Sequence, residues 1–324
     1  MRGAITGAAL LAIVLVLLAA PQGDAASSAG ANGRIAYDRA DPRSPDDTFV
    51  YTANPDGTRA HRLMARHTCC PSWSHDGRRL AIPAGLPGPG DRLSTATVGT
   101  DGRSYKLLPI KDPTLSVACA GGAWSPDDTQ LACESWDDSR PSRNGIYIRS
   151  SSAGSAPKRL TSSPGGDDAP GSYSPDGQHI VFARFNKQGA SVGLFVINTD
   201  GSRQHRITPL GLIMQGGNTG DWSPKGNDII FSRKATEAGR GSIWIVHVDG
   251  SHLRQLKVGG LACGGGIGCH GPRWSPDGRK FVFAANSASA SNIYVANADG
   301  TGLVQVTHDG HSDDPSWGTH PLSR

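Results

Sequence analysis

Carboxylate and imidazole side chains gather just before three of the aromatic residues in a motif that recurs along the chain. Carboxylates and imidazoles that converge on one point can hold a divalent cation. A cluster of such charges can also bind a charged peptide or small ligand. The alternative is that the aspartates only order their own loops through hydrogen bonds to the backbone. The residues are Asp167, Asp168, His270, Arg273, His311, Asp313 and Asp314.

These residues form no recognisable catalytic constellation, so the sequence assigns no catalytic residue, metal ligand or cofactor, and a divalent cation is the lesser alternative. Two other segments match enzyme motifs: residues 189–193 fit GxSxG around Ser191, and residues 266–271 fit GxGxxG. A nucleophile elbow needs a strand, a turn and a helix, and a dinucleotide site needs a helix N-terminus. Neither segment leads into a helical pattern, so we interpret both as loops.

The recurring motif consists of an aromatic residue, a serine, a tight turn and an apolar strand. In one copy Trp274 and Ser275 precede the turn at residues 276–278, and the apolar strand follows at residues 281–283. Proline and glycine in the turn supply the backbone angles that a hairpin needs. The motif recurs roughly every 50 residues, a period typical of propellers and solenoids. Its aromatic residues are Trp73, Trp124, Tyr173, Trp222, Trp274 and Trp317.

Each copy continues with a third apolar strand, which ends at an Asp-Gly turn in five copies and at residues 153–155 in the third copy. Strands with apolar residues on both faces need a covering layer on each side, and radial stacking supplies it. The sequence therefore predicts an all-β fold, a six-bladed β-propeller of four-stranded antiparallel blades. Strands from both termini close the ring, because the strand at Trp317 completes the sheet that begins at Arg34.

The turns and loops of such a ring divide between its two faces. The motif turns and the Asp-Gly turns are short and uniform and share one face, which we call the uniform-turn face. Loops of unequal length lie on the other face, which we call the variable-loop face. Variable loops on a rigid scaffold are where binding sites usually lie, so we expect the charged residues before the aromatics to bind a ligand on this face.

The N-terminus has the features of a targeting segment, with a basic residue, an apolar stretch and small residues before Ala26. We expect residues 1–25 to be a signal peptide and residues 26–33 to be a flexible leader. The propeller is expected over residues 34–318 and a C-terminal tail over residues 319–324. The alternative is an uncleaved anchor. The predicted location is secreted or periplasmic, with no stable membrane insertion after cleavage.

The 324-residue chain has a formal net charge of +4 and no run of lysine and arginine. This small charge gives no reason to expect nucleic acid as a partner. We expect a monomer.

Six cysteines fit an oxidising compartment. Cys263 and Cys269 flank a glycine-rich loop that can close on itself, so we expect a disulfide between them. No CxxC pair occurs, and we therefore expect no zinc site made of thiolates.

The other four cysteines lie near motif aromatics or on a predicted strand. Cys69, Cys70 and Cys119 precede aromatics in neighbouring repeats. We expect one of the first two, with Cys70 as the candidate, to form a disulfide with Cys119. Cys133 aligns with a buried strand and is expected to stay reduced as a small core residue.

The Trp-Ser-Pro-Asp-Gly turn, the apolar strand after it and the Asp-Gly turn resemble the WD40-like repeats of the TolB-like six-bladed propellers. Similar repeats occur in the propeller domains of the dipeptidyl-peptidase family. The resemblance covers roughly residues 33 to 318, and we expect a propeller without an added domain. It implies a non-catalytic binding module for a protein or peptide of the cell envelope. The alternatives are an extracellular propeller enzyme, a hydrolase or lyase acting on carbohydrate or ester with or without a metal, and a structural role in a larger complex.

Overall fold

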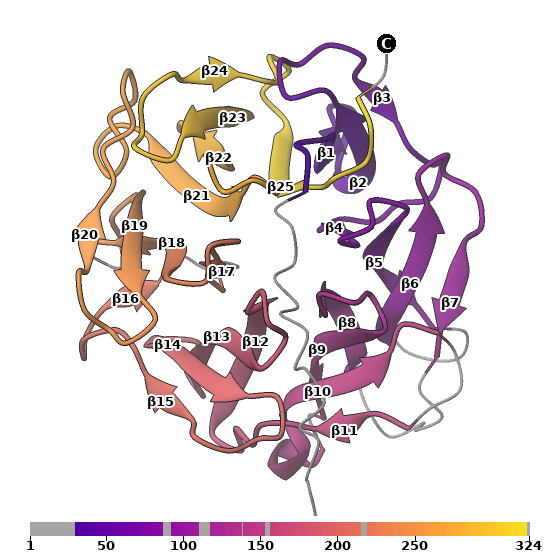
Figure 1. Ribbon diagram of the computed structural model, residues 1–324. Coiled ribbons are helices and arrows are strands. Elements are labelled where there is room, and N and C mark those ends of the chain that lie inside the picture. Colours follow the sequence, from indigo (N-terminus) through magenta and orange to yellow (C-terminus); the bar gives the residue numbers. More distant parts are fainter. Residues whose placement is uncertain are drawn as a thin grey trace, which may run out of the picture.

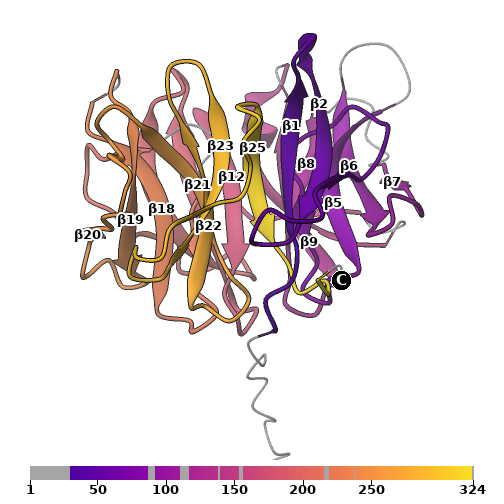
Figure 2. The same ribbon diagram turned by 90° about the horizontal axis from the view of Figure 1, so that it is seen from above.

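Antiparallel sheets stand around a central axis like the blades of a propeller in the computed structural model (Figures 1 and 2). The structure describes residues 30–86, 92–109, 117–137, 139–152, 156–214, 219–236 and 238–322. Within these ranges the helical structure is one 3-10 turn, η1 (Pro141–Arg143). The predicted all-β six-bladed propeller is confirmed.

The first three blades are numbered from the ring closure, and their strands are given from the axis outward. Blade 1 consists of β25 (Ser312–Trp317), β1 (Ile35–Asp41), β2 (Ser44–Ala53) and β3 (His61–Arg62). Blade 2 consists of β4 (Ser72–Trp73), β5 (Arg79–Gly85), β6 (Leu93–Gly99) and β7 (Lys106–Leu108). Blade 3 consists of β8 (Val117–Trp124), β9 (Gln130–Trp136), β10 (Gly145–Ser150) and β11 (Lys158–Arg159). One parallel pair, Leu93 with Val117, joins blades 2 and 3 into a single sheet.

The other three blades follow the same order. Blade 4 consists of β12 (Gly166–Tyr173), β13 (His179–Asn186), β14 (Ser191–Asn198) and β15 (His205–Arg206). Blade 5 consists of β17 (Asp221–Trp222), β18 (Asp228–Lys234), β19 (Gly241–His247) and β20 (Arg254–Gln255), and β16 (Ile213–Met214) extends it by pairing with the far end of β18. Blade 6 consists of β21 (Gly268–Trp274), β22 (Lys280–Asn286), β23 (Ser291–Asn297) and β24 (Val304–Gln305).

The motif turn is held by hydrogen bonds among its own residues. In blade 6 the Gly278 N–H donates to the Ser275 carbonyl, and Gly278 has a φ of +65°, a conformation that glycine adopts without strain. The Ser275 hydroxyl donates to Asp277 and accepts from the Lys280 N–H. This network explains why the motif repeats Ser, Asp and Gly at fixed spacing.

The third motif has Asp128 where four of the other motifs have glycine, and the structure shows why. Asp128 has a φ of +58°. Its carboxylate accepts hydrogen bonds of 2.7 and 2.8 Å from the N–H groups of His75 and Asp76 in blade 2. The contact between two blades therefore offsets the backbone strain at this position.

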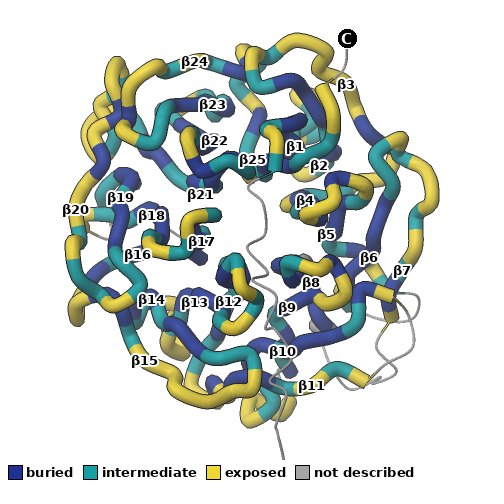
Figure 3. Tube along the Cα trace, viewed as in Figure 1, coloured by how far each residue is buried: buried dark blue, intermediate teal, exposed yellow. Residues whose placement is uncertain are grey.

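The apolar core lies in layers between neighbouring blades. One layer joins Val181 and Leu194 of blade 4 to Ile229 and Phe231 of blade 5, all four of them buried. Other layers repeat this arrangement around the ring. Figure 3 shows the burial on the inner and middle strands, whereas outer strands such as β15 and β20 are largely exposed. Each blade thus depends on both neighbours for its stability.

Strands from both ends of the described chain close the ring. β25 pairs antiparallel with β1, with Ile35 opposite Trp317. The Trp317 indole N–H donates to the Gly33 carbonyl over 2.9 Å. The expected tail also contacts a blade, because the His320 ring stacks on Trp73 with ring centroids 5.6 Å apart.

The cysteines form three pairs in the structure. Cys263 pairs with Cys269, as the sequence led us to expect. Cys119 pairs with Cys133, and Cys69 pairs with its neighbour Cys70. The expected Cys70–Cys119 bridge and the reduced Cys133 are therefore wrong in this structure. The cause is a local bulge in β8 around Cys119. It brings the Cα atom of Cys119 to 4.8 Å from the Cα atom of Cys133 on β9, close enough for a disulfide.

The predicted signal peptide and leader residues 26–29 lie outside the described residues, as does the turn at residues 153–155. Among the described residues, no helix has the length and apolar character needed to cross a bilayer.

We predict that Trp317 is required for closure of the ring. Trp317→Ala removes a side chain that is only 7% exposed, so it should lower the free energy of unfolding by about 3–5 kcal/mol. Deletion of residues 315–324 removes half of β25 and should destabilise the protein further. Denaturant melts measure both effects, and deletion of residues 321–324 alone is the control. Equal stability of the 315–324 deletion and the full chain would refute this closure.

Candidate functional site

A central channel runs along the axis of the ring and contains a cavity of about 490 Å³. Its walls are the inner strands, and every blade contributes to them. The motif aromatics lie toward one end, and the residues that precede them lie toward the other end, on the variable-loop face. In Figure 2 the β1–β2 loop marks that face at the top, and the C-terminal segment lies at the opposite face. Each blade contributes at least one residue to the lining of the cavity. In the order of blades 1 to 6, examples are Asp314, Cys70, Glu134, Gly171, Asp221 and Arg273.

The inner strands are linked around the channel by hydrogen bonds from one blade to the next. The side chain of the residue before a motif aromatic accepts a hydrogen bond. The donor is the backbone N–H of the motif aromatic in the following blade. Such contacts satisfy backbone groups on the inner strands, which have no further strand beside them. They join Ser316 to Trp73 at 3.2 Å, Ser172 to Trp222 at 2.7 Å, and Asp221 to Trp274 at 2.7 Å.

Asp221 and Arg273 bring opposite charges to the channel wall. Burial raises the pKa of Asp221, although the charge of Arg273 and the hydrogen bond from Trp274 oppose the rise. The Arg273 guanidinium also donates to the Gly220 carbonyl over 3.3 Å. Arg273 is therefore both a structural donor and a positive charge within the channel.

His270 and Asp313 form an ion pair between the inner strands β21 and β25, next to Asp314, which lines the channel. His270 Nε2 lies 2.8 Å from Asp313 Oδ1. Burial lowers the pKa of His270, but the hydrogen bond and charge of Asp313, with the charge of Asp314, outweigh it and raise this pKa overall. Burial likewise raises the pKa of Asp313, and the contact with His270 reverses the effect and lowers it. Both shifts favour the charged pair.

Asp38 adds a further carboxyl group beside this pair. It lies on β1 opposite Asp313 and is only 5% exposed. Burial and the negative charges of Asp314 and Asp313 raise its pKa to about 7, against hydrogen bonds from the N–H groups of Cys70 and Asp313. Burial and the charge of Asp313 also raise the pKa of Asp314. The carboxyl groups of Asp38, Asp313 and Asp314 therefore lie close together, and His270 pairs with that of Asp313.

The Cys69–Cys70 disulfide lies directly against these carboxyl groups. The two sulfur atoms and a carboxylate oxygen of Asp38 all lie within 4.8 Å of one another. Cys70 Sγ is 3.4 Å from Asp314 Oδ2. Cys70 and Asp314 have φ values of +54° and +43°, so two residues with side chains hold the left-handed conformation here. We call Asp38, Asp313, Asp314, His270 and the Cys69–Cys70 pair the mouth cluster.

The remaining predicted site residues lie apart from the mouth cluster. Asp168 is completely buried and makes two hydrogen bonds, of 2.6 and 2.7 Å, to the Arg184 guanidinium. Asp167 precedes it on β12 and, with Asp168, contributes to raising the pKa of Glu134 to about 7, although burial is the largest cause. His311 is exposed, and its N–H donates to the Asp309 carboxylate. The structure therefore brings together His270, Asp313 and Asp314, with Arg273 on the channel wall nearby.

Sequence reasoning missed Asp38 and Glu134, although a comparison of the repeats contains a signal for both. Each is the fourth residue of the apolar run on the second strand of its blade. Blades 4 and 6 have Ala183 and Ala284 at this position. An acidic residue that replaces alanine at a repeated core position indicates a special function, since the fold does not require it there.

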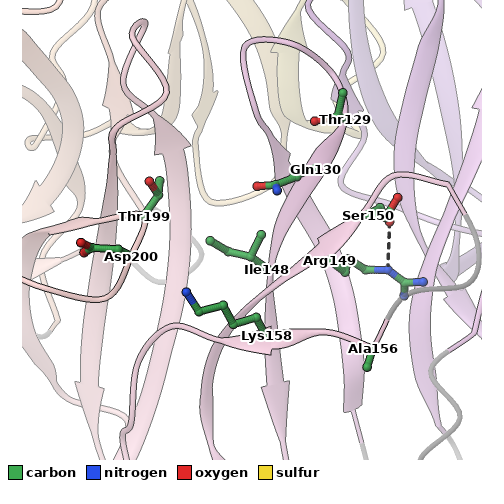
Figure 4. Close-up of a pocket in the computed structure, with 9 residues that line it drawn as sticks. All are labelled: Thr129, Gln130, Ile148, Arg149, Ser150, Ala156, Lys158, Thr199 and Asp200. Carbon is green, nitrogen blue, oxygen red and sulfur yellow. Dashed lines mark hydrogen bonds between the residues drawn. The ribbon is translucent and has the colours of Figure 1, made fainter. Parts of the chain in front are cut away.

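A second cavity, of about 630 Å³, lies away from the axis on the uniform-turn side of blades 3 and 4 (Figure 4). Arg149 is buried and donates to the carbonyls of Leu108 and Ser150. Lys158 of β11 and Asp200 of the β14–β15 turn also line this cavity, and the Lys158 amine points toward the side on which Asp200 lies. The arginine is thus occupied by backbone contacts, and the mouth cluster is the stronger candidate site.

The fold and the channel define the class of this protein as a closed six-bladed β-propeller with an acidic channel mouth. The family model described as the TolB beta propeller domain matches residues 29–320, and the chain belongs to this family. The resemblance inferred from the repeats is confirmed. No match was found among curated proteins.

Three solved structures have similar folds. TolB from Acinetobacter baumannii has 18% identity and a TM-score of 0.65, over 88% of this chain and 66% of that one. A TolB-type protein from Agrobacterium tumefaciens has 20% identity and a TM-score of 0.62, over 87% and 91%. Hydrazine synthase from Kuenenia stuttgartiensis has 14% identity and a TM-score of 0.64, over 91% and 48%. At these identities the likeness shows the fold alone.

We predict that Asp38 makes the protein less stable as pH rises from about 4 to about 7. The unfolded carboxyl has a pKa of about 3.9, whereas that of folded Asp38 is raised to about 7. The folded state therefore keeps a proton that the unfolded state has lost, and ionising Asp38 costs stability in this range. Asp38→Asn removes this cost. The difference in unfolding free energy between the variant and wild type should therefore grow in favour of the variant by on the order of 3 kcal/mol from pH 4 to pH 8.

Urea melts of both proteins at the two pH values measure this gain. Asp46→Asn is the matched control, because Asp46 is an exposed aspartate on β2. A constant difference between Asp38→Asn and wild type at both pH values would contradict the raised pKa.

Proposed function

We propose that this protein is a secreted or periplasmic binding module without catalytic activity. Its ligand is an extended, positively charged segment of a cell-envelope protein or peptide. The segment binds at the mouth cluster and enters the central channel from the variable-loop face. The single observation that carries the proposal is the group of three neighbouring carboxyl groups, Asp38, Asp313 and Asp314, of which Asp38 is buried.

The charges at the mouth are unbalanced in favour of acid. Asp38, Asp313 and Asp314 lie together, and His270 pairs with Asp313. Burial raises the pKa values of Asp38 and Asp314, and repulsion from the neighbouring aspartates raises them further, so a positive charge placed beside them would stabilise their charged forms. A lysine or arginine side chain placed here would relieve the repulsion and lower both pKa values. Chemical complementarity thus favours a cationic ligand.

The size of the channel favours a segment over a folded domain. A cavity of about 490 Å³ falls within the range of small-molecule and peptide pockets. It has room for a few side chains, so a protein partner would insert a loop or terminus and contact the surrounding loops with the rest of its surface. Membership of the TolB beta propeller family is the reason to expect a partner in the cell envelope.

The second candidate function is an extracellular propeller hydrolase or lyase that acts on carbohydrate or ester. The observation that favours it is the His270–Asp313 pair beside Asp314, because imidazoles and carboxyl groups with shifted pKa values serve as general acids and bases. The two functions differ in a direct measurement. Turnover of ester or oligosaccharide substrates that is lost in His270→Ala would favour the enzyme.

We predict that Asp313→Asn combined with Asp314→Asn weakens partner binding without unfolding the propeller. The double variant removes two negative charges from the mouth, so capture of partners from envelope extract should fall at least tenfold. The loss should be larger at low salt, because electrostatic attraction is screened as ionic strength rises. Quantitative mass spectrometry of the captured proteins, with and without an oligolysine competitor, measures the effect.

The matched control is Asp249→Asn combined with Asp299→Asn, which removes the same charge from exposed turns on the other face. Thermal melts first establish that both variants are folded, since Asp249 and Asp299 accept hydrogen bonds within their turns. Loss of capture in the control with normal capture by Asp313→Asn/Asp314→Asn would place the binding site on the uniform-turn face.

A further inference from the structure

The Cys69–Cys70 pair differs from the other two disulfides in its surroundings. Cys70 is exposed and lines the channel. Cys119, Cys133 and Cys269 are completely buried, and Cys263 is partly buried. Thiol–disulfide exchange requires the attacking thiolate to reach a sulfur atom, so exposure makes Cys69–Cys70 the first of the three to be reduced.

The groups around this disulfide suit a thiophilic metal ion once the sulfurs are free. A carboxylate oxygen of Asp38 and the sulfurs of Cys69 and Cys70 already lie within 4.8 Å of one another. The donors come from β1 and from the loop before β4, so two blades hold them in place. Asp314 Oδ2, which lies 3.4 Å from Cys70 Sγ, can supply a fourth donor. Two thiolates and two carboxylates fill the four-coordinate shell that Zn²⁺ prefers.

We propose that the mouth cluster is a redox-gated metal site, in which reduction of Cys69–Cys70 creates a binding site for Zn²⁺ or a chemically similar divalent cation. The ligands are Cys69, Cys70 and Asp38, with Asp314 completing the shell. In the oxidised protein the sulfurs bond to each other, and the site lacks its two thiolate donors. Reduction therefore switches metal binding on.

The reductant is a dithiol. One of its thiolates attacks a sulfur of the disulfide and forms a mixed disulfide, and its second thiol then displaces this bond. The dithiol becomes a cyclic disulfide, and its two electrons and two protons convert Cys69 and Cys70 to thiols. Binding of the cation then releases both thiol protons, because thiolates are the ligating form.

Electrostatics in the cluster favour the cation for a second reason. Asp38 lies opposite Asp313 in the β1–β25 pair, Asp314 follows Asp313, and His270 contacts Asp313, so three carboxylates lie together here. A divalent cation between Asp38 and Asp314 cancels the repulsion among these carboxylates and compensates the charge of the thiolates. His270 stays with Asp313 and orients that carboxylate beside the bound metal.

The test titrates the full chain, without its signal segment, with Co²⁺ as a spectroscopic probe. The protein is reduced with dithiothreitol, freed of reductant without oxygen and then titrated. The reduced protein should bind one Co²⁺ per chain with sulfur-to-cobalt charge-transfer absorption, and Zn²⁺ should displace it. The oxidised protein should show no such absorption. Absence of the band in the reduced protein would overturn the proposal.

Variants identify the ligands. Cys69→Ser combined with Cys70→Ser should abolish the band, whereas Cys263→Ser combined with Cys269→Ser should retain it. Asp38→Asn should weaken Co²⁺ binding at least tenfold, and the exposed control Asp46→Asn should bind as wild type does. The opposite result for either cysteine pair, or an unchanged affinity in Asp38→Asn, would refute the assignment.

A measurement on the wild-type chain does not depend on how the variants fold. The reduced protein is alkylated with iodoacetamide in the presence or absence of Cd²⁺, and the modified cysteines are mapped by mass spectrometry. Cd²⁺ should protect Cys69 and Cys70 together. Equal alkylation of both cysteines with and without Cd²⁺ would count against the metal site. None of these readouts requires the peptide or protein partner, so they test the metal site separately from the proposed binding function.

Discussion

The structure depends on the burial of both faces of every blade. An isolated four-stranded sheet of this composition would expose apolar side chains on two sides, and burial of such side chains stabilises a fold by about 25 cal/mol per Å². Each interblade layer, such as the one between Val181 and Phe231, exists because the next blade supplies its other half. Burial on both faces can be completed only when the ring closes, so the β25–β1 pairing is as necessary as any core layer.

The same constraint leaves one place where polar groups are required. Apart from the single Leu93–Val117 pair that joins β8 to β6, the inner strand of each blade has a partner on its outer side only, and its other edge faces the channel. The structure satisfies part of this edge with side chains from the preceding blade, as Ser172 does for Trp222 and Asp221 does for Trp274. Polar and charged residues at this edge can therefore link two blades and line the channel at the same time. Asp221 does both, because its carboxylate accepts a hydrogen bond from Trp274 and lines the channel.

Repetition made the fold predictable, whereas the site depends on departures from it. Six aromatic motifs and their turns determined the blade number and the closure at Trp317. The disulfides were predicted less well, because the bulge that brings Cys119 to Cys133 lies in β8 and has no signature in the spacing. Asp38 was missed because it occupies a strand read as uniformly apolar. Asp38 lies beside Cys69 and Cys70 although it comes from another blade, and this proximity has no signature in the spacing of the sequence.

The candidate site and the ring closure share the same strands. Asp313 and Asp314 belong to β25, Asp38 belongs to β1, and these two strands form the closing pair. A cation or a basic segment bound at the mouth cluster would lower the repulsion between carboxyl groups that face each other across this pair. A ligand that binds only the closed ring stabilises it by mass action. Binding at the proposed site and integrity of the ring would therefore be thermodynamically linked, because the last strand of the propeller both completes the fold and carries part of the proposed recognition site.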